Sequence, residues 1–140
     1  MFRKRSARAL AGGLAVLLLL VAASAAYAAV TGTFSGKTSQ KQPISFRVAH
    51  GYVTNLRFTI RERCPNGDIW KAQDHGFPKI KINKLHKFDE RFSNKVLNAR
   101  AEIKGTVFRR KVTGSIFEGR VIAKEHKFCS ATVKYTIHKQ

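Results

Sequence analysis

Histidine, cysteine and serine are the side chains through which this 140-residue sequence could most readily bind a metal or act as a nucleophile. Its five histidines show no metalloenzyme spacing, and the closest His–Cys pair is His126 with Cys129. The sequence contains neither a Gly-x-Ser-x-Gly turn for a nucleophilic serine nor a glycine-rich phosphate loop leading into a helix. We therefore predict no metal and no cofactor.

Acidic residues give two further arrangements to consider for catalysis. Asp74 precedes His75, but the sequence assigns no nucleophile to them, and the segment is typical of a polar loop. Asp89 and Glu90 are adjacent, so on a strand they would point to opposite faces and could not act as a carboxylate pair. The prediction is a non-catalytic protein, and an extracellular hydrolase with an unrecognised site is one alternative.

Basic side chains are the strongest functional signal, because the chain has 27 Lys and Arg against 8 Asp and Glu. Many of them share one face of a predicted strand, and such a face could hold a polyanion in a salt-sensitive way. The candidate residues are Arg57, Arg61, Arg63, Lys79, Lys81, Arg109, Arg110 and Lys111. The alternative is that these charges only keep strand edges soluble and prevent edge-to-edge pairing.

The elements that would position these residues are strands, because apolar residues alternate with polar ones along most of the chain. The inward-facing sets are predicted to be Ile44, Phe46 and Val48; Leu56, Phe58 and Ile60; Ile80 and Ile82; Phe88 and Phe92; Ala99, Ala101, Ile103 and Val107; and Ala131, Val133, Tyr135 and Ile137. The segment 85–97 could hold a helical turn at most. Tyr52 and Trp70 are the aromatic residues expected to be exposed.

Turns separate these strands at short intervals. Residues 65–68 form a Pro-Asn-Gly-Asp turn, and residues 109–111 are expected at a hairpin tip. The alternation slips between Gly114 and Gly119, where a β-bulge is predicted. About eight to nine strands predict an all-β fold, an antiparallel sandwich or a small barrel.

Two cysteines, Cys64 and Cys129, share the inward parity of their strands. An even number of cysteines in an exported chain favours a disulfide between them. Its loop of 65 residues would stabilise a small domain by about 4 kcal/mol in the chain-entropy model. Two reduced, buried thiols are the alternative.

The N-terminus predicts export. Four basic residues at positions 3–8 precede an apolar run, and small residues follow up to Ala26-Tyr27-Ala28. This is the pattern of a secretory signal at 1–28, cleaved after Ala28, with an uncleaved membrane anchor as the alternative. The single β domain at 29–140 would then carry 23 basic and 8 acidic residues, a net charge of +15.

Several segments carry a family resemblance. They are Gly32-Thr33-Phe34-Ser35-Gly36-Lys37-Thr38-Ser39-Gln40, Pro43-Ile44-Ser45-Phe46-Arg47-Val48, Val53-Thr54-Asn55-Leu56-Arg57-Phe58 and the residues from Cys129 to Tyr135. Together they resemble a group of small secreted β-rich proteins of actinobacteria. The resemblance implies a β fold and export, and it brings no catalytic residue and no known function.

The leading functional prediction is therefore a secreted or envelope-associated β module without catalytic activity. Its expected partners are anionic cell-wall polymers or lipid headgroups, whereas export makes intracellular nucleic acid an unexpected partner. A barrel that holds a small apolar ligand is the alternative binding function.

Overall fold

The computed structural model describes residues 30–122 and 127–140. These residues form nine strands of one antiparallel sheet and the turns that connect them. The strands are β1 (Gly32–Lys37), β2 (Pro43–Ala49), β3 (Tyr52–Arg63), β4 (Ile69–Asp74), β5 (Ile80–Lys81), β6 (Lys87–Asn94), β7 (Ala99–Val107), β8 (Lys111–Ile122) and β9 (Lys127–Lys139). The predicted all-β antiparallel fold is confirmed. The predicted leader, its cleavage site and His126 lie outside the described residues. No described helix is long and apolar enough to cross a membrane.

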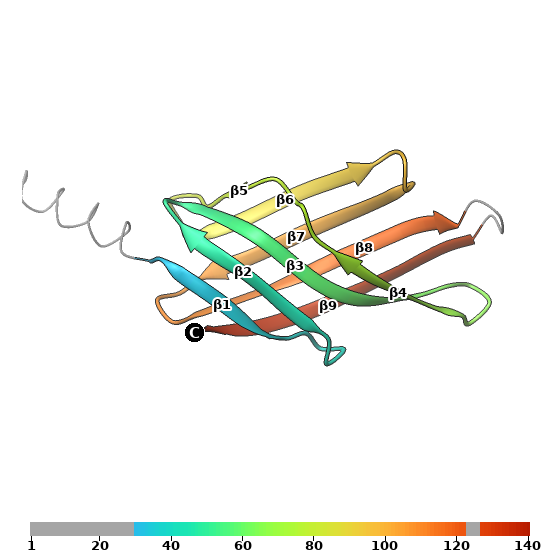
Figure 1. Cartoon of the computed structure of the whole chain (residues 1–140), viewed down its shortest axis with the longest axis horizontal. Coiled ribbons are helices and arrows are strands. Elements are labelled where there is room, and N and C mark those ends of the chain that lie inside the picture. The colour runs from blue at the N-terminus through green and yellow to red at the C-terminus, as the bar shows by residue number, and fades with distance from the viewer. Residues whose placement is uncertain (1–29, 123–126) are drawn as a thin grey trace, which may run out of the picture. The chain divides into compact units, whose positions relative to one another are not determined.

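The sheet bends back on itself, so that β2 and β3 lie over β6 and β7 (Figure 1). Its strand order is β4-β3-β2-β1-β9-β8-β7-β6, with β5 paired to β3. Phe46 of β2 meets Phe88 of β6, with ring centroids 6.1 Å apart, so distant strands of the order face each other across the interior. The end of β3 also pairs with β9, where Arg63 lies opposite Ser130. In the described ladders β4 and β6 do not pair, and the seam between these two terminal strands stays open.

Most of the residues that the alternation predicted to face inward lie in the core, whereas Phe92, Ala99 and Ala131 are only half-buried. Phe46, Ile60 and Ile103 are each at most 2 % exposed, and the charged residue that follows each of them along its strand is exposed. Tyr135 is also buried, and its hydroxyl donates a hydrogen bond of 2.7 Å to the carbonyl oxygen of Lys104. Burial raises the pKa of this phenol. The exposed positions predicted for Trp70 and, in part, for Tyr52 are also observed.

A disulfide joins Cys64, just after β3, to Cys129 in β9. Both cysteines are buried, as their inward parity predicted. The bond closes a loop across 65 residues of sequence separation and connects the two parts of the sheet where β3 meets β9. Cys129 lies opposite Arg120 of β8 in the ladder, so the disulfide adjoins the charged cluster described below.

Two local predictions need correction. Strand β8 pairs with β7 and β9 in unbroken register from Val112 to Arg120, so the bulge predicted between Gly114 and Gly119 is wrong. The irregularity lies instead between β2 and β3, where Asn55 has a φ of 53°. The alternation in β8 looked interrupted because glycine and glutamate occupy inward positions there.

The segments around β5 and β6 also differ in detail from expectation. Only Ile80–Lys81 of the segment 79–84 forms a strand. For the segment 85–97 we expected a helical turn at most. It instead holds strand β6, which is followed by a turn. The turn at 65–68 is confirmed, and the hairpin tip predicted at 109–111 is confirmed at Arg109 and Arg110, whereas Lys111 already begins β8.

Candidate functional site

Strands β2–β5 present an outer surface whose charged residues are all basic. We call this surface the basic face, and its members are Arg47, Arg57, Arg61, Arg63, Lys71 and Lys81. All six are exposed, and none forms a salt bridge with a described residue. The only acidic residues of these strands, Glu62 and Asp74, have inward parity. The surface is therefore uniformly positive.

The residues of the basic face follow one another along β3 and also lie side by side on neighbouring strands. Arg57, Arg61 and Arg63 follow one another on the outer side of β3. Arg61 lies opposite Lys71 of β4, and Arg57 lies opposite Ser45 of β2. A shallow groove crosses the strands beside Arg57. Hydroxyl and amide side chains such as Ser35, Ser45 and Gln73 line it, and Asp74 also contributes to its lining. These groups can donate hydrogen bonds to anionic oxygens.

Lys79 and Lys81 flank the same surface at β5. Lys81 lies opposite Tyr52 of β3, and the Lys79 ammonium lies 4.4 Å from the centre of the Tyr52 ring. The aromatic face thus holds one of the predicted cations in place. Five of the eight candidate residues lie on or beside this surface.

The other three candidates do not belong to it. Arg109 and Arg110 lie in the turn between β7 and β8, and Lys111 begins β8 opposite His138 of β9. In the strand order, β8 is separated from β3 by β9, β1 and β2. The predicted basic residues therefore form two separate groups.

The outer surface of β6 and β7 has a different electrostatic character. Lys104 contacts Glu102 at 2.6 Å and Asp89 at 3.9 Å, and Arg91 contacts Glu102 at 3.5 Å. The hydrogen bond from Lys104 lowers the pKa of Glu102. Arg100 lies between the rings of Phe117 and Phe128, 5.5 and 5.3 Å from their centres. Basic residues there are largely neutralised or stacked.

Inside the sheet, four charged side chains meet near the disulfide. We call Glu62, Asp74, Glu118 and Arg120 the acid cluster. Arg120 donates from Nε to Glu62 Oε2 at 2.8 Å and from Nη2 to Glu118 Oε1, and Nη2 lies 3.8 Å from Asp74 Oδ2. Glu62 is fully buried, Glu118 is 2 % exposed, and the Arg120 side chain is 12 % exposed. Three carboxyl groups thus share one guanidinium.

This shortage of positive charge is relieved by a proton. Burial raises the pKa of Glu118 to about 9, with hydrogen bonding and charge from Asp74 and hydrogen bonding from Glu62 adding to the shift. The Arg120 charge acts in the opposite direction but does not outweigh them. Burial alone would lower the pKa of Arg120, but Glu62 and Glu118 raise it overall, so the guanidinium stays charged. Near neutral pH Glu118 is a protonated acid.

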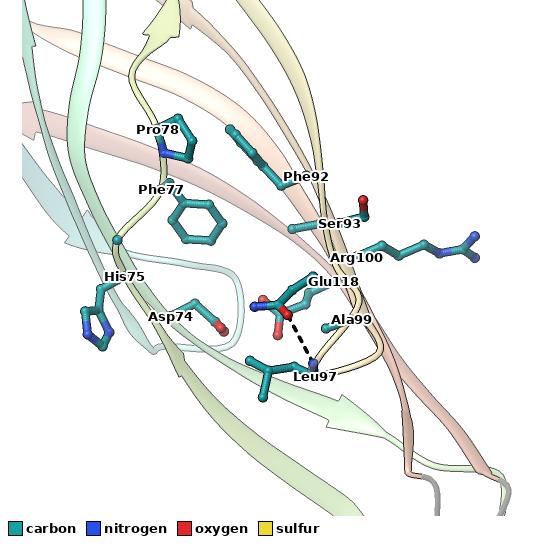
Figure 2. Close-up of a pocket in the computed structure, with 13 residues that line it drawn as sticks. Asp74, His75, Phe77, Pro78, Phe92, Ser93, Leu97, Ala99, Arg100 and Glu118 are labelled. Carbon is teal, nitrogen blue, oxygen red and sulfur yellow. Dashed lines mark hydrogen bonds between the residues drawn. The ribbon is translucent and has the colours of Figure 1, made fainter.

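The acid cluster opens on one side into a pocket at the seam between β4 and β6 (Figure 2). This seam pocket has a volume of about 280 Å³. Asp74 and Glu118 point toward each other at its floor, and Phe77 and Phe92 stand above them. The Phe77 ring contacts Phe92 at 5.2 Å and Phe58 at 5.5 Å between ring centres, which fixes the apolar wall.

The adjacent Asp74 and His75 do not form a catalytic dyad in this pocket. Figure 2 shows the His75 ring on the opposite side of the chain from the Asp74 carboxylate, because neighbouring residues in extended backbone point to opposite sides. Ser93 lies on the far wall and directs its hydroxyl away from both. Among the described residues, no group of three His, Cys, Asp or Glu side chains is arranged to hold a metal ion.

The acid cluster is the feature that the sequence prediction missed. Its members come from β3, β4 and β8 and are as much as 58 residues apart, so no local motif connects them. One signal was present: Glu62 and Glu118 both fall in line with inward apolar residues. A charged residue at an inward position is rarely buried unless it is paired.

Comparisons with models of protein families, with curated proteins and with solved structures found no match to this chain. The basic face and the seam pocket are therefore the features from which a function can be inferred.

Proposed function

We propose that this protein is a non-catalytic β module of the cell envelope or its surroundings that binds a linear anionic polymer through the basic face. The observation that carries the proposal is the separation of charge between the two sides of strands β2–β5. Six exposed basic side chains share the outer side, and both acidic residues of these strands point inward.

A linear polymer fits this arrangement better than a single small anion. Alternate residues on one side of a strand are about 7 Å apart, so Arg57, Arg61 and Arg63 extend over about 20 Å of β3. Figure 1 shows β3 as one long diagonal strand with β2 and β4 on its two sides. Charges spaced in this way match repeated anionic groups along a chain. The groove beside Arg57 offers hydrogen-bond donors to the same polymer.

The test compares two triple variants that remove the same charge. One is Arg57→Gln/Arg61→Gln/Arg63→Gln, and its matched control is Arg109→Gln/Arg110→Gln/Lys111→Gln at the β7–β8 turn. Binding of each to soluble poly(glycerol phosphate) is measured by calorimetry at about 50 mM and about 300 mM salt.

We expect the wild type to bind at low salt and to lose about tenfold or more in affinity at high salt, since exposed charges are screened. The first variant should lose about tenfold or more at low salt, and the control less than about threefold. Equal losses in the two variants would show that net charge alone matters, and absence of wild-type binding at low salt would refute the proposal. Preferential binding to anionic phospholipid vesicles would point to a membrane instead.

A further inference from the structure

Without the proton of Glu118, the floor of the seam pocket has hydrogen-bond acceptors that lack donors. Oε2 of Glu118 and Oδ2 of Asp74 are buried, and neither accepts a hydrogen bond in the described structure. Both residues line the pocket, where they point toward each other (Figure 2). Leaving a buried acceptor unsatisfied costs about 1–3 kcal/mol, and more when the group is charged. A ligand that supplies N–H groups at this position would avoid that cost when Glu118 loses its proton.

The charge of the floor also favours a cation. The carboxyl groups that face Glu118 come from β3 and β4, as Glu62 and Asp74, and Arg120 of β8 is the single cation among them. The Arg100 guanidinium is directed away from Glu118, as is the His75 ring (Figure 2). With all three acids ionised, the acid cluster would carry a net charge of −2. A bound cation can take the place of the proton on Glu118.

The walls of the pocket are mostly apolar and therefore favour a ligand with an apolar part. Phe77, Pro78 and Phe92 line it above the acids, Leu97 lies below them (Figure 2), and Ala99 and Ala101 of β7 complete the side next to Glu118. Aromatic rings near a carboxylate suit a cation that carries an apolar body, since the ring face attracts the charge and the body covers the ring. The volume of about 280 Å³ is suited to one small molecule.

We propose that the seam pocket binds a small organic cation with an apolar body, such as a guanidinium or protonated amine, whose N–H groups donate to Glu118 and Asp74. The planar fork of a guanidinium matches two carboxylate oxygens especially well. This site differs from the basic face, because its floor lies on the inner side of the sheet and it requires opposite charge from its ligand, although Asp74 and His75 also line the groove beside Arg57.

Calorimetric titration with benzylguanidinium tests the proposal on the full exported domain with its disulfide intact. This probe stays charged from pH 6 to pH 9, so only the protein titrates. Benzylurea is the neutral control of similar shape. Because the cation displaces the proton of Glu118, binding should release close to one proton below pH 9, and the affinity should rise by up to about tenfold per pH unit.

Variants give the residue-level test. Glu118→Gln keeps the shape and supplies its own N–H donor, so it should bind benzylguanidinium at least about tenfold more weakly at pH 8 and lose the pH dependence. Asp74→Asn should weaken binding without removing that dependence. Glu90→Gln removes one exposed charge from β6 outside the pocket and should bind as the wild type does.

Three results would refute the proposal: equal binding of benzylurea and benzylguanidinium, a wild-type affinity that does not change with pH, or equal losses in Glu118→Gln and Glu90→Gln. Unfolding curves for each variant separate loss of binding from loss of structure. None of these outcomes bears on the polymer measurement, so the two proposals can fail separately.

Discussion

Strand β3 carries exposed charges, unpaired among the described residues, on its outer side and a buried, paired charge on its inner side. On the outer side, Arg57, Arg61 and Arg63 extend into solvent without a salt bridge to any described acid. On the inner side, Glu62 is fully buried and accepts a hydrogen bond from Arg120 at 2.8 Å. Water screens the outer charges from one another, whereas the inner charges interact at low dielectric and must be balanced locally.

This difference predicts how each region responds to substitution. Outer charges should contribute little to folding and should act additively on binding, because each is separately hydrated. Inner charges should act as one set, because removal of any member changes the balance for the others. The following predictions test that contrast on protein stability.

The largest effect is expected for Arg120→Met. The side chain that remains has a similar length, but three carboxyl groups lose the one cation that contacts them among the described residues. Breaking a buried ion pair by removing one partner typically costs about 3–5 kcal/mol, and we expect a loss of that size in the free energy of unfolding at pH 7. Denaturant unfolding with the disulfide oxidised measures it.

Arg100→Met is the matched control for this substitution. Arg100 stacks on Phe117 and Phe128 at the outer surface, where such contacts contribute about 0.5–1 kcal/mol. The contrast between the regions would be disproved if the two arginine variants unfolded at the same denaturant concentration.

At Glu118 we expect an effect that is smaller than that of Arg120→Met at pH 7 and that depends on pH. Its pKa is about 9 in the folded protein against an ordinary value of 4.5. Between these values the folded state holds a proton that the unfolded state has released, so rising pH destabilises the wild type by up to about 1.4 kcal/mol per unit. Glu118→Gln removes this contribution. Its stability relative to the wild type should increase from pH 5 to pH 9, as measured by unfolding at each pH.

Glu62→Gln provides the comparison within the acid cluster. Glu62 accepts the Nε hydrogen bond of Arg120, so its neutralisation weakens a charge-assisted contact. We expect this variant to be less stable than the wild type at pH 7, by about 1–3 kcal/mol. If Glu118→Gln were equally destabilising at pH 7, Glu118 would not be the protonated member of the cluster.

The sequence predicted the parts of this structure that depend on local pattern. Alternation identified the inward faces of β2, β3, β7 and β9, and inward parity placed both cysteines in the core. It also identified the outward arginines of β3. These features follow from the two-residue period of a strand, which can be recognised within a single segment without knowing its neighbours in the sheet.

The acid cluster could not be predicted in this way, since it depends on which strands become neighbours. Glu62 and Arg120 meet only because the sheet bends and the end of β3 reaches β9. The polar inward position of Glu118 was instead interpreted as a slip in the pattern of β8. A buried charge breaks the alternation rule, and proteins tend to break local rules where a site is built.

The smallest effect is expected on the basic face, at Arg61. The hydrogen bonds that join Arg61 to Gln40 use only the backbone of Arg61, whose N–H donates to Gln40 Oε1 and whose carbonyl accepts from Gln40 Nε2, each at 2.8 Å. Arg61→Gln keeps both bonds and should change the free energy of unfolding by less than about 0.5 kcal/mol. Gln40→Ala removes both bonds and no charge, and should cost about 1 kcal/mol or more. Thermal unfolding of the two variants tests this prediction. A larger loss of stability in Arg61→Gln than in Gln40→Ala would mean that outer charges also support the fold. The distinction between the two sides of β3 would then be wrong.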